Sequence, residues 1–371
     1  MLVKKIDLYT IFDSLGNKTI EASLEVTLAG KNLNLLSSSP YGASKSKYEA
    51  PVIPIEKGLK SFNPLRRSLC TNHTQESFDK ILRKNINKLG SHITTALSLA
   101  FFTAQQPKKT FPNPLGVVFE GGLHSHSHKS WIQEILVMPN KPDLVSSLET
   151  NFNIWKDVKD TLHVQGRGFE SGWFIDISSE KALNKISDIA KHHKAKIGID
   201  IAASSIYSNG KYHLPDKELN SERYLDHIID ITKNHNLFYV EDPFHQDDFK
   251  SFTEFRKKTR ALVCGDDLIS SNMTRLSRAM KTNSINTTII KPNQIGTVTD
   301  CLKMMEFCKK KKITAVVSHR AGETDSDSKA MALLAQNAPL AKFGIAGERI
   351  NKLNELLRMW HTTKGRRMSR I

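Results

Sequence analysis

Short apolar runs that end in polar or charged residues recur through the C-terminal two thirds of this chain. Six of them are KIGIDIA, LFYVEDPF, ALVCGDD, TTIIKPN, AVVSHR and KFGIAG. Asp266 follows Glu241 by 25 residues, Lys291 follows Asp266 by the same distance, and segments with a helical pattern, such as SFTEFRKKTR and VTDCLKMMEFCKKKK, lie between the runs. A buried strand and a helix at this spacing are typical of one βα unit. The pattern therefore predicts a (β/α) barrel.

Charged side chains stand where these predicted strands end. They are Asp200, Glu241, Asp266, Lys291 and the pair His319-Arg320. Barrel enzymes form their active site at the C-terminal ends of the strands, so these groups should converge. Three carboxylates at one place repel one another unless a cation neutralises them, and oxygen ligands suit Mg²⁺. We interpret them as a magnesium site; capping of helix N-termini is the alternative, which explains one or two positions but not three consecutive strand ends.

The N-terminal part has a different pattern. Residues 3–28 alternate apolar and polar in two runs around the turn-prone DSLGN, which predicts a hairpin. A loop rich in Ser, Pro and Gly follows at 37–47, then two helical stretches, and PKKTFPNP indicates a linker. We predict an α+β N-terminal domain over residues 1–108 and a barrel domain over residues 109–371.

Composition limits the partners. The formal net charge of +16 over 371 residues favours an anionic substrate or a polyanion. RNA contact through the basic surface stays open, although no RNP-like motif or zinc finger supports it. The most apolar run, 97–104, is far shorter than the roughly 20 residues of a membrane helix, and the N-terminus lacks a secretory pattern. Four cysteines without a CxxC pair predict free thiols. We expect a cytoplasmic protein with no membrane contact.

Several of these segments resemble the enolase (phosphopyruvate hydratase) family. The blocks IGIDIAAS, YVEDPFHQDD, GDDLISSN, IIKPNQIG and SHRAGET carry the resemblance, which runs from DSLGNKTIE to GERINKLNELLRMW. It implies an α/β fold in which a smaller α+β N-terminal domain precedes an enolase-type variant (β/α)8 barrel that begins with two strands and two helices. It also implies Mg²⁺-dependent dehydration of 2-phosphoglycerate, a small phosphorylated three-carbon substrate, to phosphoenolpyruvate, with two Mg²⁺ ions per active site and usually a homodimer.

The resemblance extends to the metal ligands. The positions that match the ligands of the first Mg²⁺ are Asp200, Glu241 and Asp266. Ser44 matches the serine of a mobile loop that closes over the substrate and joins the second Mg²⁺. In this loop Tyr41, Ser46 and Tyr48 replace a serine, a glycine and a histidine of the family, which favours a less flexible loop.

Two further positions match the groups that move protons. Lys291 resembles the general base that removes the proton beside the substrate carboxylate, a role for which nearby cationic charge must lower its pKa. Glu170, in GFESGW, resembles the general acid that protonates the departing hydroxyl. Phe169 replaces the aspartate that precedes this acid in the family.

The remaining matches concern the substrate. They are His124, Gln133 and Glu134 on the substrate side, and His319, Arg320, Ala321 and Lys342 at the phosphate. Ala321 replaces a serine, so the resemblance implies the loss of one phosphate hydrogen bond. The alternating His124, His126 and His128 also fit a separate transition-metal site on an extended segment, an alternative to a substrate contact by His124.

Three functions stay open at this point. An active hydratase is favoured because the base, the acid and three metal ligands are all present. An enolase-like binding protein with little turnover is favoured by Phe169, Ala321 and the altered loop. A lyase for another carboxylate is disfavoured, because a substrate without phosphate would leave Arg320 and Lys342 unpaired. Leu15, where the family has an arginine of the dimer contact, and the shortened N-terminal domain leave homodimerisation open.

Overall fold

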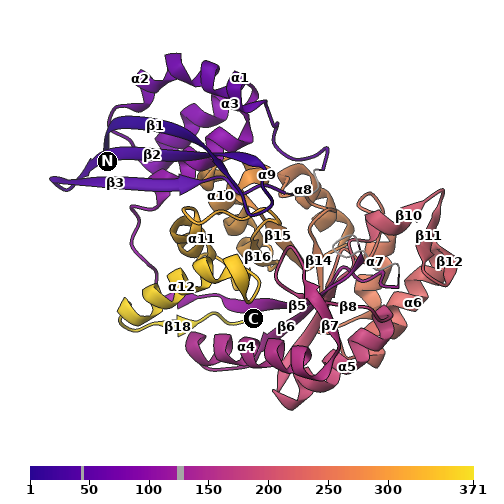
Figure 1. The fold of residues 1–371 in the computed structure, drawn as a ribbon. Helices are drawn as coiled ribbons and strands as arrows, with labels where there is room; N and C mark the ends of the chain where they lie inside the picture. The colour runs from indigo at the N-terminus through magenta and orange to yellow at the C-terminus, as the bar shows by residue number, and fades with distance from the viewer. Residues whose placement is uncertain (43–45, 123–128) are drawn as a thin grey trace.

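The computed structural model describes residues 1–42, 46–122 and 129–371. The N-terminal part holds an antiparallel sheet in the order β1-β2-β3 and the helices that cover it (Figure 1). The strands are β1 (Leu2–Phe12), β2 (Lys18–Leu28) and β3 (Lys31–Ser38), and the helices are α1 (Ile55–Phe62), α2 (Arg66–Leu69) and α3 (Gln75–Phe102), with the 3₁₀ turn η1 (Asn63–Leu65) between α1 and α2. The first two strands form the predicted hairpin, and β3 adds a strand that the alternation did not predict.

The N-terminal sheet forms its own core with α3. Alternate residues of β2, among them Ile20, Leu24 and Val26, are fully or almost fully buried, because one face of the pleated sheet turns toward the helix. The same helix packs against the barrel helices α9 (Pro292–Ile295) and α10 (Val298–Lys310). The buried carboxylate of Asp79 on α3 accepts a hydrogen bond of 2.8 Å from the backbone N–H of Thr299, which fixes α3 against the first turn of α10.

The C-terminal part is a closed barrel that has eight strands among the described residues. They are β5 (Asn113–Glu120), β6 (Glu134–Pro139), β9 (Ala195–Asp200), β13 (Tyr239–Glu241), β14 (Leu262–Gly265), β15 (Thr287–Ile290), β16 (Thr314–Ser318) and β17 (Leu340–Lys342). The pairing of β17 with β5 closes the sheet. Strand β6 runs antiparallel to both β5 and β9, and the other neighbours are parallel. This confirms the predicted variant barrel, which begins with two strands.

Helices surround the barrel (Figure 1). They are α4 (Leu144–Thr161), α5 (Ser179–His192), α6 (Ser221–Asn234), α7 (Phe249–Lys258), α8 (Met273–Thr282), α9, α10, α11 (Ser328–Ala335) and α12 (Ile350–Thr362). The helices α4 and α5 follow β6 in succession, with a hairpin of β7 (Val164–Arg167) and β8 (Trp173–Ile175) between them. Smaller elements are β4 (Thr110–Phe111), η3 (Ala203–Ile206), β10 (Tyr207–Ser208), β11 (Lys211–Leu214), β12 (Lys217–Asn220), η4 (Gly347–Arg349) and β18 (Arg367–Met368).

Two apolar layers hold the barrel together. Inside it, side chains such as Leu136, Tyr239 and Ile289 fill the space between the strands. A larger layer lies between the strands and the surrounding helices. Polar caps set where helices begin: Asn220 and Thr297, for example, each accept a hydrogen bond from a backbone N–H in the first helical turn. The strand ends, and hence the site residues, are therefore held by a packed frame.

No helix in the described parts of the chain combines the length and the apolar character needed to span a membrane. All four cysteines are free thiols, as predicted, and Cys264, Cys301 and Cys308 are buried.

Gly90 breaks α3 and gives a prediction for stability. Its backbone has φ +78° and ψ 158°, a conformation that is essentially restricted to glycine, and an added Cβ would lie 2.9 Å from the backbone nitrogen of Ile53. We expect Gly90→Ala to lower the free energy of unfolding by about 1–3 kcal/mol. Urea denaturation measures this change. Gly166→Ala is the control, because its Cβ meets no atom within 4 Å and its φ is not positive; equal losses in both variants would contradict the explanation.

Candidate active site

A cavity of about 750 Å³ lies at the C-terminal ends of the barrel strands. Its walls include the carboxylates of Asp200 and Asp266, the amine of Lys291 and, from the N-terminal part, Gly42 and Glu49. A volume of this size suits a small organic ligand. The two parts of the protein therefore build the cavity together.

Three predicted metal ligands come from three adjacent strands. Asp200 ends β9, Glu241 ends β13, and Asp266 directly follows β14, so the strand register brings them to the same rim of the barrel. Their side chains are buried or nearly so, and Glu241 is completely buried. The convergence follows from the parallel register.

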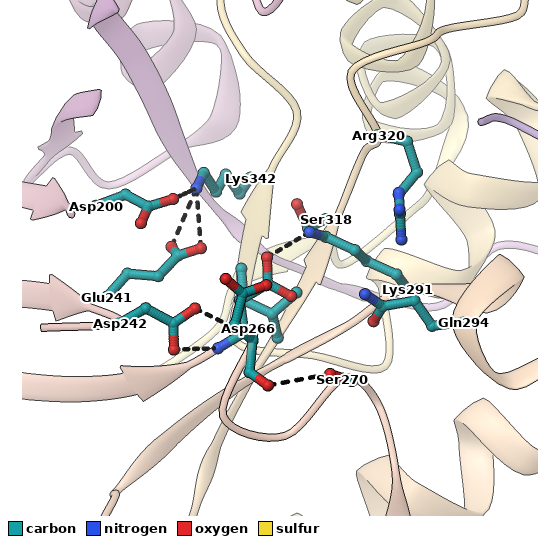
Figure 2. A network of polar contacts seen from close by, with 12 residues as sticks. Asp200, Glu241, Asp242, Asp266, Ser270, Lys291, Gln294, Ser318, Arg320 and Lys342 are labelled. Carbon is teal, nitrogen blue, oxygen red and sulfur yellow. Dashed lines mark hydrogen bonds and ion pairs between the residues drawn. The ribbon is translucent and has the colours of Figure 1, made fainter. Parts of the chain in front are cut away.

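Lys342, the last residue of β17, lies among these acids (Figure 2). Its Nζ is 3.0 Å from Oδ2 of Asp200, 3.1 Å from both carboxylate oxygens of Glu241, and 2.8 Å from Oε2 of Glu134. Glu134 is the buried first residue of β6, and its neighbour Gln133 lines the cavity. The sequence placed Lys342 at the substrate phosphate; in the structure its ammonium group pairs with carboxylates.

Burial and neighbouring charges shift the pKa values of Glu241, Glu134 and Lys342. Burial raises the pKa of Glu241 well above its ordinary value, and the charge of Asp200 adds to this, while Lys342 opposes it. Burial also raises the pKa of Glu134 well above its ordinary value. Burial lowers the pKa of Lys342, but Asp200, Glu134 and Glu241 outweigh this and raise it well above the ordinary value. The cluster thus stabilises a cation at its centre.

The donor set fits a hard divalent cation. The ammonium group of Lys342 already occupies a position between Asp200 and Glu241, and the ligands around it are carboxylate oxygens. The buried Oδ1 of Asp266 has no hydrogen-bond partner within the described ranges, so it is available to a cation. Asp200, Glu241 and Asp266 together therefore suit Mg²⁺.

Asp242 is a site residue that the sequence analysis missed. It lies next to Glu241 with φ +39°, and its carboxylate accepts hydrogen bonds from the backbone N–H groups of Asp266 (3.2 Å) and Asp267 (2.6 Å). One oxygen from each of Asp242, Asp266 and Asp267 lies within 4.8 Å of the others. Because the Asp242 carboxylate accepts hydrogen bonds from these backbone amides, we infer that it positions the loop that carries Asp266. The EDPF block held this aspartate, but no spacing rule connects it to that loop.

Lys291 follows β15 and forms an ion pair with Asp266 (Figure 2). Its backbone N–H donates to Oγ of Ser271 at 2.9 Å, and this hydroxyl donates to Oε1 of Gln294 at 2.6 Å. Burial lowers the pKa of Lys291, but Asp266 outweighs this and leaves the pKa raised. The amine is therefore protonated here, and the role of a base requires additional positive charge beside it.

Glu170 lines another wall of the cavity and contacts His319. Glu170 lies in the turn between β7 and β8, and its Oε2 is hydrogen-bonded to Nε2 of His319, which follows β16. Both side chains are buried, and burial lowers the pKa of His319. The sequence placed His319 at the phosphate; in the structure its ring contacts the predicted general acid.

Arg320 and Ala321 lie where the N-terminal part touches the barrel. Nη1 of Arg320 is 3.6 Å from Oε2 of Glu49, and both Arg320 and Ala321 line the cavity. A Cβ at Gly42 would overlap the guanidinium group of Arg320, so this close approach requires glycine. In Figure 2, Arg320 lies apart from Lys342 and its carboxylates.

Tyr48 attaches the loop segment that follows residue 45. Its hydroxyl donates to Oδ1 of Asp247 at 2.8 Å, and the guanidinium group of Arg275 lies 3.8 Å from the centre of its ring. Ser44 of the same loop, as well as His124, His126 and His128, lies outside the described residues.

Known proteins resemble this chain over nearly its whole length. Residues 108–365 match the family described as "Enolase, C-terminal TIM barrel domain". A protein named Enolase from Picrophilus torridus is 33% identical, and the match covers 96% of this chain and 98% of the relative. Two further proteins with the same name are each 31% identical to this chain. The match to the one from Archaeoglobus fulgidus covers 97% of this chain and 97% of the relative. The match to the one from Natronomonas pharaonis covers 96% of this chain and 98% of the relative.

The fold and the site agree with these matches. The second strand of the barrel runs antiparallel to its neighbours, and the strand ends carry acids and a lysine. These features agree with the match to the enolase C-terminal barrel, so the protein belongs to the class with that barrel. Since the relatives also match the N-terminal part, the chain belongs to the enolase family.

Removal of the Lys342 charge tests the cation site. We expect Lys342→Met to lower the free energy of unfolding by about 3–5 kcal/mol without divalent ions, because it leaves buried carboxylates unpaired. Added Mg²⁺ should stabilise this variant more than it stabilises the parent, because the ammonium group no longer competes for the acids. Urea denaturation with and without Mg²⁺ measures both effects.

Lys352→Met provides the matched control. Lys352 is also completely buried, and it pairs with Glu323 and Asp327 away from the cavity. The loss of unfolding free energy in Lys352→Met should be similar in size to that in Lys342→Met but insensitive to Mg²⁺. The same Mg²⁺ response in both variants would refute a cation site at Asp200 and Glu241.

Proposed function

We propose that this protein is a hydro-lyase that dehydrates 2-phosphoglycerate to phosphoenolpyruvate, as in glycolysis and gluconeogenesis, with Mg²⁺ as its cofactor. The observation that carries the proposal is the arrangement of one cavity. It brings a lysine, Lys291, and a carboxylic acid, Glu170, to walls that also hold the carboxylate cluster. A reaction that removes a proton from one carbon and protonates a hydroxyl on the next needs two such groups.

The chain's own residues divide the work. Asp200, Glu241 and Asp266 would hold the first Mg²⁺. When bound, the metal supplies positive charge that stabilises negative charge developing on the substrate carboxylate and lowers the pKa of Lys291. Lys291 then accepts the proton at C2 on its Nζ, and the Glu170 carboxyl gives a proton to the hydroxyl that leaves from C3.

The phosphate is assigned to the opposite part of the cavity. Arg320 presents a planar fork that matches phosphate oxygens. Glu49, at 3.6 Å from Nη1, is the anion that a phosphate would compete with for this guanidinium group. Lys342 pairs with carboxylates in this structure, so we assign its charge a part in drawing the anionic substrate inward. Gln133, Glu134, His124 and the second Mg²⁺ ligand Ser44 complete the proposal on the basis of the family resemblance.

The direct test uses the purified protein, Mg²⁺ and 2-phosphoglycerate. The enol product absorbs in the ultraviolet, so its formation can be followed continuously. Turnover that a chelator abolishes supports the proposal. A protein that binds the substrate but forms no product would instead be an enolase-like binding protein, the alternative that Phe169, Ala321 and the altered loop favour. RNA contact through the basic surface belongs to that alternative and stays open.

Assembly and location belong to the same proposal: a homodimer in the cytoplasm. Large apolar side chains on the N-terminal sheet, including Tyr9, Phe12 and Leu36, are 44–65% exposed, which supports contact with a second copy. Sedimentation velocity measures the assembly. A monomer at micromolar concentration would contradict the dimer and leave the activity untouched.

Substitutions of Lys291 and Glu170 should impair different steps of the reaction. Lys291→Ala should lower exchange of the substrate's C2 proton with solvent by about 10²–10⁴-fold, since no base remains. Glu170→Gln should lower dehydration by a similar factor but spare the exchange. Deuterium incorporation and product absorbance measure the two steps. An equal loss of exchange in both variants would contradict these roles.

Ala321 lines the cavity beside Arg320, so a serine there should add a bond to the phosphate. Such a charge-assisted hydrogen bond contributes about 1.5–3 kcal/mol, and about 1.4 kcal/mol is tenfold in a binding constant. Ala321→Ser should therefore tighten 2-phosphoglycerate binding by about tenfold or more, as measured by calorimetry. Glycerate without the phosphate is the control and should show no gain. The same gain for both ligands would place the phosphate elsewhere.

A further inference from the structure

The turn that carries Glu170 is tightly formed. Gly168 donates its backbone N–H to the carbonyl of Gly172 at 2.8 Å, and Ser171 donates to the carbonyl of Gly168 at 3.1 Å. Ser171 has φ +67°. The turn directs the side chain of Glu170 toward His319, so its backbone decides where the acid lies.

The carboxylate of Glu120 binds the amides of this turn. Glu120 is the last residue of β5 and is completely buried. Its Oε1 accepts hydrogen bonds from the backbone N–H of Glu170 at 2.9 Å and from that of Gly172 at 2.7 Å. Both bonds are buried, so loss of the acceptor would leave two buried N–H groups without a partner for these bonds.

Two glycines make room for this carboxylate. A Cβ at Gly168 would lie 2.3 Å from Oε2 of Glu120, and one at Gly172 would lie 3.0 Å from Cγ. By contrast, Gly166, two residues before Gly168, has open space beside it. The close approach is therefore specific to the part of the segment that holds the acid.

The other side of the turn is also bound. Arg349 is completely buried and donates to the carbonyl of Phe169, to that of Arg320 at 2.6 Å and to that of Ala321 at 2.8 Å. Glu120 thus accepts hydrogen bonds from the backbone amides of the turn, and Arg349 donates one to a carbonyl of the same turn. The side chain of Phe169, which replaces the family's aspartate, is 43% exposed.

We propose that Glu120 is a positioning residue for the general acid of this enzyme. Its carboxylate, which comes from β5, binds the backbone amides of the turn. In this chain Phe169 stands where the family has an aspartate in the turn. Without it, two buried N–H groups lose their acceptor and the turn relaxes. This inference rests on the proposed function, because it concerns the step in which Glu170 protonates the leaving hydroxyl.

The test compares two substitutions at Glu120. Glu120→Met has a similar length and no acceptor for the amides, and we expect dehydration to fall by about 10²-fold, the effect of a misplacement by about 1 Å. Exchange of the C2 proton should stay near the parent rate, because Lys291, which follows β15, is held by Asp266 and not by this turn. Glu120→Gln keeps one carbonyl oxygen in place of Oε1, and its ratio of dehydration to exchange should remain close to that of the parent.

A pair of glycine variants provides a second measurement should Glu120→Met fail to fold. Gly168→Ala would push the flexible end of Glu120 away, so it should lower dehydration but not exchange. Gly166→Ala, its matched control, should leave both rates unchanged because its Cβ meets no atom within 4 Å.

The outcomes separate the two proposals. A parent protein that neither exchanges the C2 proton nor forms product overturns the proposed function and this inference with it. An active parent whose Glu120→Met and Gly168→Ala variants keep the parent's ratio of dehydration to exchange overturns the inference alone. An equal loss of both rates, or a Glu120→Gln variant as impaired as Glu120→Met, also overturns it, since neither result fits an acceptor that positions only the acid.

Discussion

Buried negative charge at the mouth of the barrel is the constraint on which the site depends. Glu134, Asp200 and Glu241 end or begin adjacent strands, and such charges destabilise the fold unless a cation lies among them. In this structure the cation is Lys342, which reaches them from β17 across the interior. The same electrostatic demand that holds Lys342 makes the cluster a strong ligand set for a divalent ion. The stability of the fold and the proposed metal affinity therefore have a common origin in this protein.

The barrel was predictable from the sequence because its signal is regular. Fully buried strands such as β15 and β16 are short apolar runs, and one βα unit requires a nearly constant length. The start of the barrel with two strands and two helices was not contained in that spacing and came from the family resemblance, and the antiparallel direction of β6 was not predicted. The hairpin of β7 and β8 was missed because its strands are short and alternate weakly, and β3 was missed because its first four residues are exposed. In these strands tertiary packing, which no local pattern records, decides the structure.

The candidate site was predictable where a residue ends a strand. Asp200, Glu241, Asp266 and Lys291 were placed by that rule. Three of them, Asp200, Asp266 and Lys291, line one cavity, and Glu241 shares the ammonium group of Lys342 with Asp200. Asp242 and Glu120 were missed, since each acts on backbone amides of a distant segment. Glu120 lies 50 residues before Glu170, and no sequence period connects a carboxylate to the amides that it binds. The carboxylate partners of Lys342 and His319 could not be predicted from the sequence for a similar reason. They depend on which side chains lie together in the interior of the barrel.

The groups proposed for proton transfer differ in how they are held, and this difference follows from charge balance. Arg349 binds carbonyls of both the Glu170 turn and the His319-Arg320 segment, and its own charge is balanced by Glu323 at 3.0 Å. The segment that carries the proposed acid and the segment that carries the proposed phosphate ligand Arg320 therefore both contact one buried cation. Lys291, by contrast, is held by Asp266, which is itself a proposed metal ligand. In the proposed mechanism, cation binding changes the partner of the proposed base Lys291, whereas the proposed acid Glu170 keeps its place through Glu120 and Arg349, which places the two proposed proton transfers under separate electrostatic control.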